Sequence, residues 1–124
     1  MAKRKSISST HVTNQDTKRT LTLALKYLQK GWTQGQLAVD KEGYFVEPQD
    51  LSAVRWCAMG AIEKADGKGE NRARRLVCEF LPDNFQYLED FNDYQGTTKG
   101  KVLSLFTKAL KSLQPLQPKK KGTR

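Results

Sequence analysis

The stretch VRWCAMGAI, residues 54–62, decides how the middle of the chain folds. Small or apolar residues recur in and just after it at intervals of three and one, at Val54, Cys57, Ala58, Ala61, Ile62 and Ala65. This spacing puts their side chains on one face of an α-helix. We therefore expect a central helix that Asp50 or Ser52 caps and that ends at Asp66 and Gly67.

Two residues of this stretch need a separate explanation. Gly60 costs a helix interior about 1 kcal/mol relative to alanine, so it predicts that another backbone, or a ring such as Trp32 or Trp56, crosses closely there. Cys57 lies on the apolar stripe and is interpreted as a core residue. A catalytic thiol needs a lowered pKa and a base, usually histidine, and the only histidine is His11, near the N-terminus.

Two further elements are expected upstream. A helical stripe is formed by Leu21, Ala24, Leu25 and Leu28. Asn14 or Asp16 can cap this helix, and Gly31 stops it. Two short apolar runs, residues 37–39 and 44–46, then flank a turn that contains glycine, which predicts a small β-hairpin.

Downstream, the pattern predicts three helices, of which one is short. The first spans residues 70–81 and ends before Pro82, and residues 85–91 can form the short one. A last helix opens at Thr97 or Thr98. Its stripe consists of Val102, Leu103, Phe106, Ala109, Leu110 and Leu113. The predicted fold class is mainly α, a compact bundle of four to five short helices with one small β-hairpin.

A chain of 124 residues fits one domain, which we expect to be a single helical domain at residues 14–114. Residues 1–13 and 115–124 are expected to be disordered basic tails, because they combine basic residues with few apolar ones. No apolar run approaches the roughly 18 residues of a membrane span, and none follows the basic N-terminus as in a secretory signal. With two cysteines in helical context, these features predict a cytoplasmic protein with reduced thiols and no membrane partner.

The formal charge of +9 lies mostly at the ends of the chain. Residues 1–20 carry +4, residues 115–124 carry another +4, and residues 21–114 carry only +1. A near-neutral body with two cationic ends differs from a basic nucleic-acid-binding domain. Any phosphate contact is therefore expected to begin with the ends, Lys119, Lys120 and Lys121 above all.

Four sequence blocks follow one another between residues 21 and 111. They are Gly-Trp, Ala-x-Asp-x-x-Gly, Trp-Cys-x-x-Gly-Ala and Asn-Asp-x-x-x-x-Thr, with Trp32, Asp40, Gly43, Trp56, Cys57, Gly60, Asn92, Asp93 and Thr98 as the block residues. In these blocks the chain resembles a small uncharacterised domain family of bacteria and their phages. The function of that family is unknown, so the resemblance implies no catalytic residue. The chain departs from the family pattern at Phe91, where a tryptophan is expected.

Few groups of residues in the sequence suggest metal binding, catalysis or phosphate binding. Two scattered cysteines and one distant histidine do not make the tetrahedral set of ligands that structural zinc prefers, so we expect no metal and no cofactor. The carboxylates of LEDFND, residues 88–93, could hold Mg²⁺ or act as acid and base, but such clusters more often fix turns or face solvent. Arg72, Arg74 and Arg75 could bind phosphate or an acidic partner, or could form a solvated helix face.

Two function classes remain, ahead of an enzyme of unknown type. The first is a small non-enzymatic binding module, phage-encoded or bacterial, whose helical body contacts a host or phage protein. The second is a nucleic-acid-associated protein that neutralises phosphates with its basic tails and Arg-rich helix start, without reading sequence. The first ranks higher because no recognition helix, RNA-binding aromatic signature or zinc finger is visible. The sequence predicts no oligomeric state.

Overall fold

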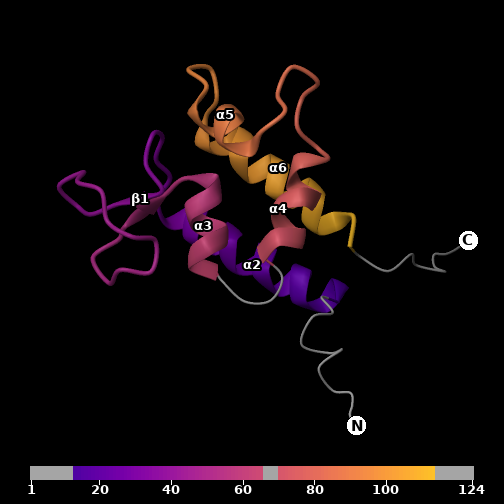
Figure 1. Cartoon of the computed structure of the whole chain (residues 1–124), viewed down its shortest axis with the longest axis horizontal. Coiled ribbons are helices and arrows are strands. Elements are labelled where there is room, and N and C mark those ends of the chain that lie inside the picture. Colours follow the sequence, from indigo (N-terminus) through magenta and orange to yellow (C-terminus); the bar gives the residue numbers. More distant parts are fainter. Residues whose placement is uncertain (1–12, 66–69, 114–124) are drawn as a thin grey trace, which may run out of the picture.

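The structure is a computed structural model that describes residues 13–65 and 70–113 (Figure 1). Within these residues the chain forms five helices and a two-stranded antiparallel sheet. Their order is α2 (Asn14–Lys30), β1 (Ala38–Val39), β2 (Arg55–Trp56), α3 (Ala58–Ala65), α4 (Glu70–Cys78), α5 (Leu88–Asp93) and α6 (Lys99–Lys111). The predicted mainly α fold with a small β element is confirmed.

The helix α2 is capped by Thr13 and not by Asn14 or Asp16. The Thr13 hydroxyl accepts a hydrogen bond from the Asp16 backbone N–H at 3.0 Å, and the Asp16 carboxylate accepts one from the Thr13 N–H at 3.2 Å. This reciprocal capping box satisfies two backbone donors that the helix itself leaves open. Gly31 ends the helix as predicted, and its N–H donates to the Tyr27 carbonyl.

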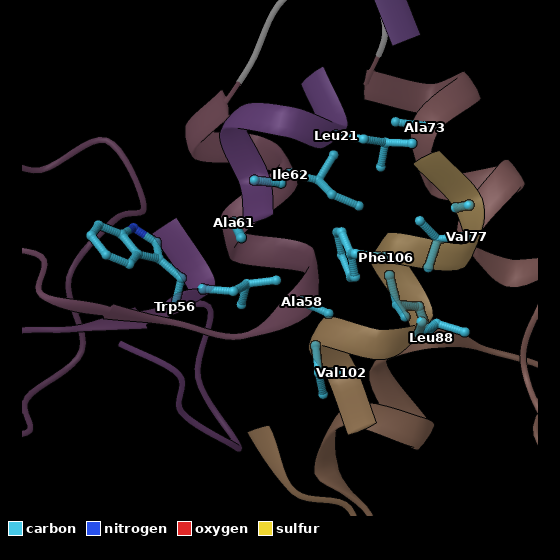
Figure 2. Close-up of a cluster of buried hydrophobic side chains, with 14 of the residues drawn as sticks. Leu21, Trp56, Ala58, Ala61, Ile62, Ala73, Val77, Leu88, Val102 and Phe106 are labelled. Carbon is cyan, nitrogen blue, oxygen red and sulfur yellow. The ribbon is translucent and has the colours of Figure 1, made fainter. Parts of the chain in front are cut away.

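The core forms around α2, which contacts α3, α4 and α6. Figure 2 shows Leu21, Ile62, Val77 and Phe106 converging from these four helices, and each exposes 1% of its surface or less. Burying a side chain of this size stabilises a fold by about 1.5–3 kcal/mol. The cluster therefore fixes how the helices lie against one another.

The predicted hairpin forms only in part, because residues 44–46 make a single bridge to β1 and the strand that pairs with β1 is the unpredicted β2. Val39 bridges Phe45 in the antiparallel sense, around a turn in which Gly43 has a φ of 90°. On its other side Val39 pairs with Arg55 of β2. In Figure 1 the segment from β1 to β2, residues 38–56, which we call the β-lobe, projects to one side of the helices, opposite the end at which α2 begins and α6 finishes.

The prediction that Asp50 or Ser52 starts the central helix is wrong, because α3 begins at Ala58. The Asp50 carboxylate instead accepts hydrogen bonds from the N–H and the hydroxyl of Ser52, which closes a turn. After the turn the Val54 N–H donates to the Val39 carbonyl. Val54 therefore belongs to the β-lobe, is 40% exposed and does not contribute to the helical stripe.

The second half of the chain follows the prediction more closely. The helix α4 ends at Cys78, and turns continue the chain to Pro82. Thr98 caps α6, since its hydroxyl accepts a hydrogen bond from the Lys101 N–H at 3.3 Å. The buried face of α6 consists of Val102, Leu105, Phe106 and Ala109. The predicted stripe contained Leu103 and Leu110, which are half-buried, and lacked Leu105.

Two further points concern membrane-spanning helices and the two ends of the chain. No helix within the described residues is both long enough and apolar enough to cross a membrane. Residues 1–12 and 114–124 lie outside the described residues, so the predicted basic tails stay a prediction.

Candidate functional site

Several block residues meet where α3 begins, and Asn92 of α5 joins them. Its buried Oδ1 accepts hydrogen bonds from the Trp32 indole N–H at 2.8 Å and from the Ala58 backbone N–H at 2.9 Å. Its Nδ2 donates to the Thr33 carbonyl at 3.1 Å and to the Asp93 carboxylate at 2.9 Å. The amide thus uses both lone pairs and both protons. Asn92 ties the Trp32 loop, α3 and α5 together.

Asp93 and Trp56 support the same junction. The Asp93 carboxylate also accepts a hydrogen bond from the Gly35 N–H at 2.9 Å. The Trp56 indole donates to the Pro48 carbonyl at 3.0 Å, and its ring lies 5.2 Å from the ring of Tyr27. The ring contact fastens the β-lobe to α2, and the hydrogen bond closes the β-lobe itself.

Cys57 is buried, as predicted, and it caps α3. Its carbonyl accepts the N–H of Ala61 at 2.8 Å, and its sulfur accepts the N–H of Gly60 at 3.3 Å. Burial raises the pKa of the thiol, which outweighs the lowering by the Gly60 N–H, and the charge of Asp93 raises the pKa further. A reactive cysteine needs a lowered pKa. The geometry therefore gives Cys57 the role of an N-cap.

This role predicts the order of two substitutions. Serine is a strong N-cap because its hydroxyl accepts the same hydrogen bond, whereas alanine cannot accept it and costs about 1 kcal/mol. We expect Cys57→Ser to unfold at nearly the urea concentration of the parent and Cys57→Ala to unfold earlier. An alanine variant as stable as the serine variant would contradict the capping role.

The backbone crossing predicted at Gly60 is confirmed. A Cβ atom at this position would overlap the carbonyl group of Leu37, just before β1. The suggestion that a ring of Trp32 or Trp56 crosses there is wrong, because backbone occupies the space.

The remaining block residues shape turns and a helix start. The Asp40 carboxylate accepts hydrogen bonds from the N–H groups of Glu42 and Tyr44, each at 2.9 Å. Gly43 supplies the positive φ of that turn, and Thr98 caps α6. These contacts give Asp40, Gly43 and Thr98 structural roles in a turn and a helix cap.

A small cavity of about 240 Å³ lies beside the block residues. It is lined by Gly35, Gln36, Leu37, Cys57, Met59, Glu89 and Asp93. Its titratable groups are a thiol of raised pKa and two carboxylates, which cannot stabilise a thiolate. Within the described residues, no three His, Cys, Asp or Glu side chains gather closely enough to hold a metal ion.

The three arginines that the sequence grouped together, Arg72, Arg74 and Arg75, do not all line one site. Arg72 donates to the side chain of Asn14 at 2.6 Å, and Arg74 donates to that of Asn71 at 3.0 Å. Arg72 and Arg75, but not Arg74, line a hollow of about 460 Å³. The other residues of this hollow are Leu76, Glu79 and Leu113. Lys119, Lys120, Lys121 and His11 lie outside the described residues.

A further hollow of about 340 Å³, which we call the aromatic groove, was not predicted. Its aromatic wall contains Phe80, Phe85, Phe91 and Tyr94. The α6 wall contains Lys101, Ser104, Leu105 and Lys108. Positions 101, 104 and 108 follow a helical spacing of three and four, the one sequence signal that could have indicated a common face.

The aromatic wall is ordered by ring contacts. The ring of Phe85 lies 5.3 Å from the rings of Phe91 and Tyr94, with edge-to-face geometry in both pairs. Such pairs stabilise a wall beyond the area that they bury. Tyr94 remains 54% exposed, so an apolar surface persists at the rim.

Comparison with known proteins identifies the family. No curated protein and no solved structure matches the chain. A family model with the description "Family of unknown function (DUF6197)" matches residues 12–112, which include all four sequence blocks. This match covers most of the chain and agrees with the resemblance that the blocks indicated. The chain therefore belongs to DUF6197, a family of unknown function.

Proposed function

We propose that this chain is a small, non-enzymatic, cytoplasmic protein-binding module whose contact surface is the aromatic groove. The observation that carries the proposal is a hollow lined by four aromatic side chains, of which Tyr94 is exposed, and left unfilled by the described segments of the chain. Binding sites are typically concave and mainly apolar, with a few polar groups that give orientation. Aromatic side chains are also enriched at protein interfaces.

The partners of the block residues favour binding over catalysis. Asn92, Asp93 and Cys57 each already hold a backbone N–H in the folded protein. The Cys57 thiol has a raised pKa and carboxylates beside it, so it lacks the cationic neighbour that activates a nucleophile. In the aromatic groove, by contrast, the exposed side chains of Ser104 and Lys108 form no hydrogen bond with the described residues.

Peptide selection tests this proposal. We expect the full-length protein to enrich binders from a random dodecapeptide display library, and we expect Ser104→Tyr, which fills the groove, to weaken them at least tenfold. Thr107→Tyr is the matched control, because Thr107 is exposed on the same helix but does not line the groove. Binders that tolerate Ser104→Tyr, or no binders at all, would contradict the proposal.

The hollow at Arg72 and Arg75 favours a second candidate, association with nucleic acid. Leu113 lines this hollow and precedes Lys119 by six residues in the sequence. Glu79 lies in the same hollow and weakens its attraction for phosphate.

Filter binding to random duplex DNA at two salt concentrations tests this second candidate. Each phosphate that a cation neutralises contributes about −0.9 to the slope of log affinity against log salt. We expect a protein with Lys119, Lys120 and Lys121 replaced by glutamine to show a flatter slope than the parent. Absence of measurable binding by the parent would exclude this candidate.

A further inference from the structure

We infer that the aromatic groove accepts a short acidic segment of another protein, with two carboxylates about 10 Å apart on either side of an apolar side chain. This inference rests on the proposed function and specifies the chemistry of the partner. Its basis is the pair of lysines on α6 that line the groove together with the aromatic rings.

The spacing of the lysines sets the spacing of the carboxylates. Lys101 and Lys108 are seven residues apart on α6, which is two turns of helix and about 10.5 Å. Two acidic residues seven positions apart on a bound helix match this distance. In an extended segment, side chains three positions apart point to opposite faces, so only the helical spacing of seven presents both carboxylates to α6.

The charges of the groove call for an acidic partner. No carboxylate lines the groove, and neither lysine forms an ion pair with any residue in the described part of the chain. Lys101 donates to the Gly96 carbonyl at 3.1 Å, which leaves two of its three ammonium protons available. A purely apolar segment would cover these cations without compensation, whereas carboxylates would form charge-assisted hydrogen bonds with them.

The chain's own ends have the wrong charge for this groove. Residues 1–12 and 114–124 contain basic residues and no Asp or Glu, so the lysines repel them. Nucleic acid fits less well, because stacking of bases needs open ring faces. Phe91 is 6% exposed and Phe85 is only half-exposed between its two ring neighbours, which leaves Tyr94 as the main exposed ring.

A charge exchange tests the inference with the same dodecapeptide library. We expect peptides selected by the full-length parent to carry two Asp or Glu residues seven positions apart around an apolar residue. The variant Lys101→Glu/Lys108→Glu should bind these peptides at least tenfold more weakly and should select Lys or Arg at the same spacing. Lys26→Glu/Lys30→Glu on α2 makes the same change in net charge at exposed positions outside the groove and should bind like the parent.

Each outcome has a defined meaning once circular dichroism has shown that the variants are folded. The single variants Lys101→Gln and Lys108→Gln, expected to weaken the same peptides severalfold, provide the answer if the double variant does not fold. Selected peptides that lack acidic pairs but are lost in Ser104→Tyr would overturn this inference and leave the proposed function standing. A parent dimer in sedimentation that Ser104→Tyr dissociates, or groove-dependent binding of oligo(dT) in place of peptides, would overturn the inference by identifying another occupant. Absence of any groove-dependent binding would overturn both proposals.

Discussion

Gly60→Ala is expected to destabilise the protein by about 3 kcal/mol, although alanine is the better helix former. Helix propensity alone would stabilise the variant by up to about 1 kcal/mol. The added Cβ would however overlap the carbonyl group of Leu37, and this backbone is held in turn by the N–H of Cys57. To relieve this overlap, the backbone at Leu37 and α3 must move apart. This movement breaks the attachment of the β-lobe to the helices.

Gly100→Ala is the matched control, measured in the same urea titrations. Gly100 lies in the first turn of α6, where an added Cβ would meet only the Thr98 hydroxyl oxygen, at 3.9 Å. This variant should be as stable as the parent or slightly more stable. If both alanine variants were stabilising, the crossing of Leu37 over α3 would be wrong.

Asn92→Leu is expected to cost about 4 kcal/mol. Leucine has a similar size but leaves the Trp32 indole N–H and the Ala58 N–H without their acceptor, and each orphaned buried donor costs about 1–3 kcal/mol. The Thr33 carbonyl loses a donor as well. Thermal unfolding followed by circular dichroism measures the loss, and the near-ultraviolet signal of Trp32 should change with it.

Asn84→Leu provides the comparison for Asn92→Leu. Asn84 is exposed and its side chain forms no hydrogen bond with the described residues, so the change should stay within about 0.5 kcal/mol. Equal stability of the two leucine variants would show that Asn92 does not join the three segments.

The helices of this fold could be predicted where apolar residues recur at the helical spacing and a helix-ending residue follows them. The helix α2, of 17 residues, carries its apolar stripe from Leu21 to Leu28 and stops at Gly31, and α6, of 13 residues, carries its own from Val102 to Ala109. The strand β2 could not be predicted, because Val54 and Cys57 fit a helical stripe as well as a strand. The groups that decide between the two, such as the Val39 carbonyl, lie far away in the sequence.

The candidate site was harder to predict than the fold. Sequence blocks pointed to Asn92 and Cys57, but their roles depend on partners that only folding brings together. The Trp32 indole, for example, lies 60 residues from Asn92 in the chain. The aromatic groove combines Phe85, which looked like a residue of a short helix, with Lys101 and Lys108, which carried no motif. Composition and spacing cannot show that such residues line one hollow.

Amide chemical-shift mapping of the full-length protein with a selected peptide tests the central claim most directly. If the aromatic groove is the contact surface, the largest shifts will occur in residues 80–85, in residues 94–97 and along α6 from Lys101 to Lys108. Shifts centred instead on Gly35, Cys57 and Asp93, around the cavity beside the block residues, would contradict the claim and would move the function to the sequence blocks.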